Sequence, residues 1–161
     1  MLSAIANFIK PNYFEMKDSS IYSEETFYKT FTKDLGKCRS EVIIESPFMT
    51  CRRVSYLLPT LKQLKKSRVK IIVNTRNPEE HDKFMCTEAR RSLALLLENG
   101  IQVIFSESLH RKTAILDRNV LWEGSLNIMS QNDSLEVMRR TESTKLAWQM
   151  VQFTKLDVRI N

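Results

Sequence analysis

Short continuous apolar runs alternate along the chain with longer segments in which apolar residues recur every three or four positions. The short runs predict buried strands, because a strand covered on both faces carries no regular polar positions. The longer segments predict helices with one apolar face. The predicted strands lie at residues 41–48, 69–73 and 101–105, and the predicted helices at 23–36, 50–66, 83–99 and 145–156. This alternation is typical of an α/β domain with a mixed β-sheet flanked by helices on both faces.

Capping residues, glycine and proline indicate where several helices begin and end. Ser23, followed by two glutamates, is a typical helix start. Gly36 and Gly100 are expected to end helices, because glycine readily adopts the backbone conformation found just past a helix. Pro59 favours a break within residues 50–66, or a new helix that begins there.

The chain of 161 residues is long enough to bury the core of one domain without disulfides. Residues 1–20 show no clear period and are interpreted as an N-terminal arm, which leaves residues 21–161 as a single domain. An odd number of cysteines argues for reduced thiols and a cytoplasmic location. They are Cys38, Cys51 and Cys86.

Charge and composition narrow the range of partners. The net charge of +6 favours a polyanion such as nucleic acid. No apolar run is long enough to span a bilayer, so no membrane partner is expected. With two histidines and no CxxC spacing, neither a metal site nor a cofactor is predicted.

Residues 109–136 concentrate the groups that phosphodiester chemistry needs. His110 and Lys112 are two positions apart, so on a strand they project from the same face. An imidazole can act as a nucleophile or carry a proton near neutral pH, and a lysine can hold a phosphate as a point charge. After a predicted hairpin, Ser125 and Asn127 share a face in the same way and offer neutral hydrogen-bonding groups to phosphoryl oxygens.

The segments HRKTAILD (110–117) and GSLN (124–127) resemble the HxKxxxxD…GSxN signature of the phospholipase D superfamily. Six residues separate the two segments. The resemblance implies the fold of a phospholipase D-like half-domain. It also implies a histidine nucleophile that forms a covalent phosphohistidine without a metal ion.

The resemblance assigns a role to each motif residue. His110 is the nucleophile or the acid. Lys112 and Asn127 hold the phosphoryl oxygens, and Ser125 assists them. Asp117 is mostly structural in this superfamily.

In the same superfamily, an acidic residue after the motif commonly orients the histidine. Glu136 fits that role by its position in the sequence. Asp133 and Glu142 are competing candidates, and geometry has to choose among the three.

The resemblance also implies a second motif histidine, which protonates the leaving oxygen. This chain carries one motif, so a homodimer with one active site shared by two chains is expected. His81 is the only other histidine. It lacks a neighbouring lysine and lies between acidic residues, so it is interpreted as a surface residue.

Several basic residues are candidates for binding the nucleic acid backbone, although such residues are also common on solvated faces. Arg111 lies next to the motif, and a lysine-rich face is predicted on the helix that ends at residue 66. A short helix is expected to begin at residue 133 or 134 and to carry two arginines at its end. The candidates are Arg111, Lys62, Lys65, Lys66, Arg139 and Arg140.

These observations favour a metal-independent phosphodiesterase that acts on nucleic acid, DNA rather than RNA. By resemblance, it is similar to the small single-motif nucleases of the superfamily and to the nuclease-like modules that accompany helicases. The alternative is a catalytically silent module that binds nucleic acid or dimerises. A phospholipid hydrolase is less favoured, because it typically carries two motifs in a much longer chain.

Overall fold

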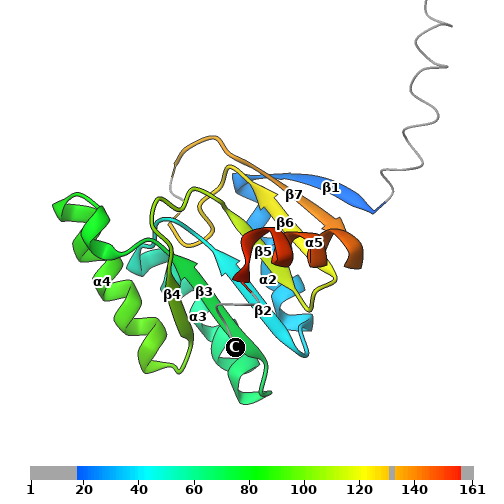
Figure 1. Cartoon of the computed structure of the whole chain (residues 1–161), viewed down its shortest axis with the longest axis horizontal. Coiled ribbons are helices and arrows are strands. Elements are labelled where there is room, and N and C mark those ends of the chain that lie inside the picture. Colours follow the sequence, from blue (N-terminus) through cyan, green and yellow to red (C-terminus); the bar gives the residue numbers. More distant parts are fainter. Residues whose placement is uncertain (1–17, 131–132, 157–161) are drawn as a thin grey trace, which may run out of the picture.

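The computed structural model describes residues 18–130 and 133–156 of the chain. Within these residues, seven strands form one sheet in the order β1-β7-β6-β5-β2-β3-β4 (Figure 1). The strands are β1 (Ser19–Ser23), β2 (Glu41–Glu45), β3 (Lys70–Thr75), β4 (Gln102–Phe105), β5 (Thr113–Leu116), β6 (Val120–Gly124) and β7 (Val137–Glu142). The helices are α2 (Glu24–Lys37), α3 (Cys51–Lys66), α4 (Lys83–Glu98) and α5 (Thr144–Thr154), with a short 3₁₀ helix η1 (Pro78–Glu80).

The sheet is mixed, and β2 is the strand at which its direction changes. β2 runs parallel to β3, and β3 runs parallel to β4, with α3 and α4 as the crossover helices. On its other side β2 is antiparallel to β5, and the pairs β5·β6, β6·β7 and β7·β1 are antiparallel as well. The carboxyl ends of β2, β3, β4 and β6 therefore lie at the same end of the sheet as the amino ends of β5 and β7.

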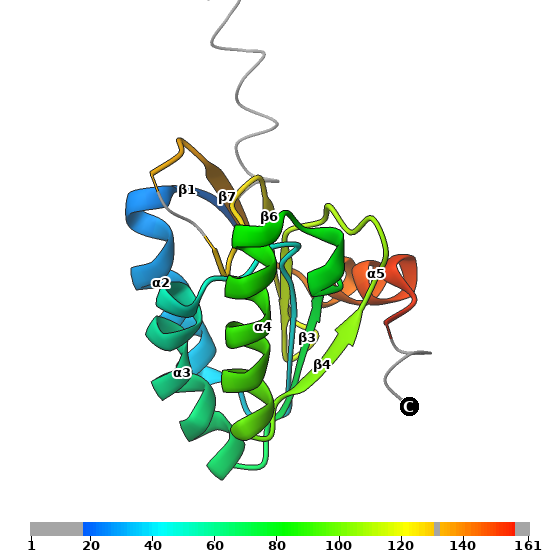
Figure 2. The ribbon, with the colours of Figure 1, turned by 90° about the vertical axis from the view of Figure 1, so that its left-hand side faces the viewer.

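Helices cover both faces of the sheet, but unequally. Helices α2, α3 and α4 lie on one face, and α5 lies on the other (Figure 2). Alternate residues of β2 belong to two separate cores: Val42 and Ile44 to the larger core, and Ile43 to the core that includes residues of α5. Because β2 is buried from both sides, its sequence reads as one apolar run. The predicted fold class is confirmed.

Aromatic rings join α2 to the strand that leads into the GSLN segment. Phe27 and Phe31 are fully buried, and both rings meet the Trp122 ring edge-on, with centroids 5.2 and 5.9 Å away. This geometry suits the charge distribution of aromatic rings. Since Trp122 is two residues before the end of β6, the cluster helps to fix where that strand ends.

The prediction of a short helix that begins at Asp133 or Ser134 is wrong. The chain forms β7 instead, which pairs with β6 on one side and with β1 on the other. β1 lies more than 100 residues away in sequence and β6 about a dozen, and pairing with them satisfies the backbone and buries Met138 completely. Local spacing carries no signal for such long-range pairs.

The break predicted at Pro59 is also wrong, because α3 continues through it. Pro59 is exposed, so water can reach the carbonyl group that loses its helical donor. Apolar residues on both sides of the proline pack into the same core and hold the helix together. They are Val54, Leu57, Leu61 and Leu64.

The ends of the other elements are close to the predictions. Helix α2 begins after Ser23, as predicted, and ends one residue beyond Gly36. Helix α4 ends just before Gly100, whose φ of +68° is the left-handed conformation expected there. Ser19 and Ser20 belong to β1 although they were assigned to the arm at residues 1–20, and residues 1–17 lie outside the described part of the chain.

Candidate active site

Four of the motif residues, together with Glu136, gather at one end of the sheet, which we call the site end. His110 and Lys112 lie just before β5, Ser125 and Asn127 follow β6, and Glu136 lies just before β7. β6 runs antiparallel to both β5 and β7, so its carboxyl end adjoins their amino ends. The sheet thereby brings these three segments to one place.

The side chain of His110 is exposed, and its ring contacts Arg76, which is outside the sequence motif and was not among the predicted site residues. Nη2 of Arg76 lies 2.6 Å from Nε2 of His110, and Nε of Arg76 donates to the Leu109 carbonyl oxygen at 2.7 Å. A guanidinium group has donors only, so Nε2 must be the acceptor in this contact. The contact therefore requires the tautomer in which Nε2 carries a lone pair and no proton.

One signal could have identified Arg76 from the sequence. It directly follows β3, one of the buried parallel strands. Ligand sites in α/β sheets form at the carboxyl ends of such strands. The sequence predicted this strand, but it did not show that its end lies beside His110.

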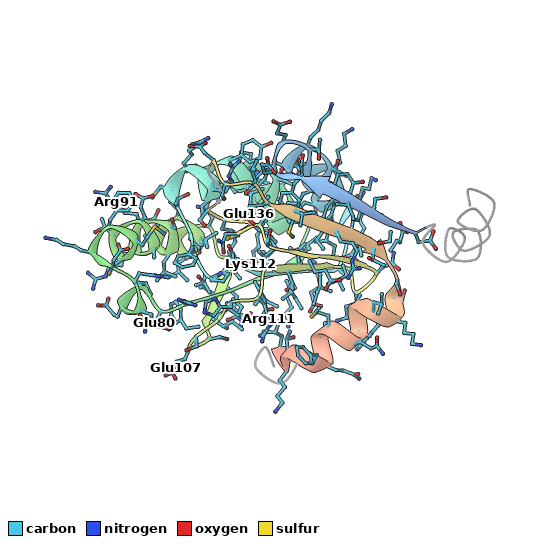
Figure 3. The ribbon with its side chains drawn as sticks, turned by 90° about the horizontal axis from the view of Figure 1, so that it is seen from above. Glu80, Arg91, Glu107, Arg111, Lys112 and Glu136 are labelled. Atoms are coloured by element: carbon cyan, nitrogen blue, oxygen red, sulfur yellow. The ribbon has the colours of Figure 1, made fainter. Side chains whose placement is uncertain are left out.

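Lys112 lies between the neighbouring charged groups at the site end. His110 and Lys112 were predicted to lie on a strand. Instead, they lie in the segment that leads into β5, which begins at Thr113. Nζ of Lys112 donates to the His110 carbonyl oxygen at 2.7 Å. Burial lowers the pKa of Lys112, Glu136 acts to raise it and Arg76 acts to lower it, with a net lowering. Figure 3 shows Lys112 between Arg111 and Glu136 in the view from above.

The GSLN segment is tied to the start of β7. The Ser125 amide donates to the Val137 carbonyl oxygen at 2.9 Å, and the Ser125 hydroxyl accepts from the Val137 amide at 3.1 Å. A Cβ added to Gly124 would lie 2.1 Å from the same carbonyl oxygen, so only glycine fits there. Oδ1 of Asn127 is buried without a hydrogen-bond partner among the described residues.

Of the three candidate acidic residues, Glu136 is the one placed next to Lys112. Its charge acts on the pKa of Lys112, and its Oε1 accepts a hydrogen bond from the Ser134 hydroxyl at 3.0 Å. Glu142 lies at the opposite end of β7, where it pairs with Arg140. No hydrogen bond joins Glu136 to His110 in the described structure, so the orienting role of Glu136 stays a prediction.

Asp117 lies at the far end of β5 and serves the fold. Its carboxylate accepts hydrogen bonds from the Arg39, Ser40 and Glu41 amides at 2.8 to 2.9 Å, and from the Ser40 hydroxyl at 2.8 Å. Burial acts to raise the pKa of Asp117, but these hydrogen bonds outweigh it and hold the pKa below its usual range. This agrees with the mostly structural role that the resemblance implied.

Arg111 forms an ion pair with a buried glutamate. Its Nε and Nη2 donate to the two oxygens of Glu45, each at 2.8 Å, and Glu45 is fully buried. The same carboxylate accepts from Asn74 and Thr113 at 2.8 and 3.0 Å. Arg111 thus neutralises a buried carboxylate, and the structure does not leave its guanidinium unpaired for a nucleic acid phosphate.

The other basic candidates are not gathered around His110. Arg139 pairs with Glu123, and Arg140 pairs with the buried Asp34. Both arginines lie on β7 rather than on the predicted helix end. Helix α3 begins at the site end of the sheet, and its lysines lie near its other end. They are Lys62, Lys65 and Lys66. Contacts between these residues and nucleic acid stay predictions.

His81, the other histidine of the chain, is half-buried rather than a plain surface residue. Its ring centroid lies 5.0 Å from that of Phe48, and its Nε2 is buried with no hydrogen-bond partner among the described residues. Burial and the charge of Arg76 lower the pKa of His81, although Glu80 and Asp82 act to raise it. His81 is therefore a neutral imidazole at neutral pH.

None of the helices in the described residues is both long and apolar enough to cross a bilayer. The described residues also contain no group of three or more histidine, cysteine, aspartate or glutamate side chains placed to hold a metal ion.

Known proteins share this fold. Nuc from Salmonella typhimurium, a phospholipase D family member, superposes with a TM-score of 0.67 at 14% identity, over 84% of this chain and 91% of Nuc. NucT from Helicobacter pylori gives a TM-score of 0.67 at 17% identity, over 88% of this chain and 95% of NucT. Phosphatidylserine synthase from Haemophilus influenzae gives 0.66 at 10% identity, over 86% of this chain and 36% of the synthase.

The structural likenesses show the fold alone, because the identities are low. No curated protein matches the chain by sequence. A family model described as "Cardiolipin synthase, PLD-like domain" matches residues 31–156, which is most of the chain. The match includes the motif residues that the sheet brings together at its site end, and the chain therefore belongs to the phospholipase D superfamily.

Proposed function

We propose that the protein is a metal-independent phosphodiesterase that cleaves nucleic acid, with DNA favoured over RNA. The observation that carries the proposal is an exposed imidazole, His110, flanked by the cations of Lys112 and Arg76. An imidazole can attack phosphorus, and cations stabilise the charge on the phosphoryl oxygens. Ser125 and Asn127, at the same end of the sheet, add neutral hydrogen-bonding groups.

The proposed reaction has two steps. In the first step Nε2 of His110 bonds to phosphorus, the bond from phosphorus to the leaving oxygen breaks, and a second histidine gives that oxygen a proton. In the second step water attacks the phosphohistidine, the bond from phosphorus to nitrogen breaks, and the second histidine takes a proton from the water. Lys112 and Asn127 hold the non-bridging oxygens in both steps. Glu136 is proposed to orient the imidazole through its other nitrogen.

The second histidine is proposed to come from another copy of this chain. His81 is a poor acid for the leaving oxygen, because its lowered pKa leaves it without the proton to give at neutral pH. Two copies of His110 that meet on a two-fold axis supply one nucleophile and one acid. A homodimer with one shared site is therefore the arrangement that completes the chemistry.

An apolar surface beside Lys112 supports the dimer. An open hollow of about 490 Å³ is lined by Lys112, Arg139, Val137 and Phe153, among others. Ile21 and Phe153 are 70% and 75% exposed at this hollow. A second copy seated over the site end would cover these side chains and bring its own His110 towards the first.

Nucleic acid is favoured over lipid by the likeness to Nuc and NucT and by the charge of the chain. The chain spans nearly the whole of Nuc and NucT but 36% of the phosphatidylserine synthase. The net charge of +6 also suits a polyanion. A cytoplasmic location and association with a helicase stay predictions from the sequence.

Phosphatidyl transfer is the second candidate function, favoured by the description of the matching family model and by the synthase fold. One assay separates the two. Purified protein is incubated with single- and double-stranded DNA, with RNA and with phosphatidylglycerol vesicles, each with and without excess EDTA. Cleavage of DNA that survives EDTA and is lost in His110→Asn supports the proposal. Turnover of lipid alone, or cleavage that needs an added divalent metal, contradicts it.

A further inference from the structure

Arg76 contacts the atom that is expected to attack phosphorus. Its Nη2 lies 2.6 Å from Nε2 of His110. The rest of the guanidinium is anchored, because Nε donates to the Leu109 carbonyl oxygen at 2.7 Å and the central carbon lies 5.4 Å from the centre of the Phe48 ring. The side chain thus bridges the end of β3 and the entry to β5.

This contact selects the reactive form of His110 and also blocks it. Arginine keeps its proton in proteins, so the hydrogen bond requires an unprotonated Nε2 and puts the ring proton on Nδ1. A nucleophile needs that lone pair, yet here the lone pair is bound to Nη2. The contact between Arg76 and His110 must therefore break before Nε2 bonds to phosphorus.

The broken contact has an obvious replacement. A phosphoryl group bonded to Nε2 places its non-bridging oxygens around that nitrogen, where Nη2 now lies. Arg76 can exchange the nitrogen acceptor for an anionic oxygen if its planar guanidinium turns about Nε, which can stay on the Leu109 carbonyl oxygen. The present contact joins a cation to a neutral nitrogen, whereas the new one would join a cation to an anion, so the exchange favours the reacting state.

The charge of Arg76 is also uncompensated, unlike that of other arginines near the sheet. Within the described residues Arg76 has no carboxylate partner at ion-pair distance, whereas Arg111 is paired with Glu45 and Arg139 with Glu123. A half-buried cation without a counterion costs free energy, which an incoming phosphate would recover.

We propose that Arg76 is a catalytic residue: before substrate binds it holds Nε2 of His110 in the unprotonated tautomer, and during the reaction it leaves Nε2 for the non-bridging phosphoryl oxygens, which also frees Nε2 of the acid copy of His110 to take up its proton. This inference rests on the proposed phosphodiester chemistry at His110. Arg76 would be a third side chain, with Lys112 and Asn127, that binds the phosphoryl oxygens. The sequence motif does not contain this residue.

The kinetic test uses bis(4-nitrophenyl) phosphate, a phosphodiester that needs neither DNA nor lipid recognition. Wild type is compared with Arg76→Ala, Arg76→Lys and the control Arg91→Ala, which removes an exposed arginine on α4 away from the site (Figure 3). We expect kcat to fall by about 10²–10³-fold in Arg76→Ala, as for the loss of one transition-state hydrogen-bond donor, with a smaller change in KM. Lysine should restore part of kcat, and guanidinium ion added to Arg76→Ala should restore more than ammonium does. Full kcat in Arg76→Ala, with circular dichroism like that of wild type, would overturn the inference.

A second measurement does not depend on turnover. The ¹⁵N chemical shifts of the His110 ring, above the pH at which it is protonated, report which nitrogen carries the proton. We expect an unprotonated Nε2 in wild type and in Arg91→Ala, and a mixture of tautomers in Arg76→Ala. Inorganic phosphate should shift the Arg76 side-chain signals.

The two measurements separate failure of the inference from failure of the proposed function. If wild type cleaves no phosphodiester, the proposed function fails, and the Arg76 inference is then decided by the spectra. Phosphate-induced shifts of the Arg76 signals would support its role as a phosphoryl ligand. Absence of these shifts, or an unchanged tautomer in Arg76→Ala, would overturn it.

Discussion

Two arginines near His110 have different electrostatic surroundings. Arg76 meets only neutral acceptors among the described residues, and one of them is the proposed nucleophile. Arg111 is bound on two nitrogens by the buried carboxylate of Glu45. The same residue type therefore serves catalysis in one case and folding in the other, and substitutions should separate the two effects.

Arg111→Ala should lower the free energy of unfolding by about 2–3 kcal/mol, because it leaves the Glu45 carboxylate buried without its counterion. We expect less than the roughly 3–5 kcal/mol that is lost when a fully buried ion pair is broken, because Arg111 is 39% exposed and water can reach the pair. Urea denaturation measures it. Arg139→Ala, which breaks a more exposed ion pair, is the control and should change stability by less than about 0.5 kcal/mol. Equal effects of the two substitutions would contradict the assignment.

Lys112 should limit activity at alkaline pH. Burial lowers its pKa below the ordinary 10.5, so the ammonium is lost, and phosphate binding with it, at a lower pH than for an exposed lysine. We expect kcat to decline below pH 10.5, and Lys112→Arg to move this decline to higher pH, because arginine keeps its charge. Rates are measured over pH 7 to 11, with circular dichroism to exclude unfolding. If kcat declined at the same pH in wild type and in Lys112→Arg, the decline would be due to a group other than Lys112.

At the scale of elements, the hairpin of β5 and β6 connects the site to a structural clamp at its other end. Asp117 and Arg118 form the turn, with φ of 49° and 50°, and the Asp117 carboxylate accepts hydrogen bonds from three successive amides that lead into β2. The turn thereby fixes the hairpin of β5 and β6 against β2.

Asp117→Asn should destabilise the protein by about 1–2 kcal/mol at neutral pH and leave kcat unchanged. Asparagine tolerates the left-handed conformation, so the change removes mainly the charge. Because the folded pKa of Asp117 is depressed, its contribution is present above the unfolded value near 3.8 and is lost as pH falls through the folded value. The difference in stability between the two proteins should therefore shrink below about pH 4. A constant difference down to pH 2, or a large loss of kcat, would argue against this role.

The elements show how far the sequence could be interpreted. β2 and β3 were predicted because both of their faces are buried, which leaves an apolar run in the sequence, and α4 because its apolar face is regular. β1 and β7 were missed because their stability comes from each other and from β6, across more than 100 residues of sequence in the case of β1. Pro59 was overestimated as a helix breaker, because packing on both sides of it outweighs one lost hydrogen bond.

The candidate site could be predicted only where its residues are close together in the sequence. His110, Lys112, Ser125 and Asn127 form a local pattern whose spacing is visible in the chain. Arg76 lies 34 residues before His110, and their contact depends on the order of β3, β2 and β5 in the sheet. The ion pairs of Arg111 and Arg140 were likewise invisible, because Glu45 and Asp34 come from distant elements.

At the scale of the whole molecule, activity should require two chains. Wild type and His110→Ala are mixed in equal amounts and allowed to exchange, so that random pairing leaves roughly a quarter of dimers fully wild type. Activity per dimer should fall towards a quarter, because a mixed dimer lacks either the nucleophile or the acid. Activity near one half after verified exchange would mean that each chain works alone.

The surface of the proposed dimer can be tested separately. Phe153→Asp should convert the dimer to monomers and abolish activity, because it puts a charge into the apolar surface beside the site. Phe84→Asp is the matched control, since Phe84 is equally exposed, at 73% against 75%, but lies on α4 on the other face. Sedimentation velocity measures both variants.

The central claim is that His110 bonds covalently to phosphorus during turnover. The protein is incubated with a short DNA substrate in excess EDTA and quenched in alkaline denaturant, in which phosphohistidine is stable, and its peptides are weighed by mass spectrometry. We predict that the peptide containing His110 carries a phosphoryl-linked DNA fragment, and that the His110→Asn substitution or omission of DNA abolishes this adduct. Rapid turnover with no adduct on His110, or an adduct on another residue, would contradict the account.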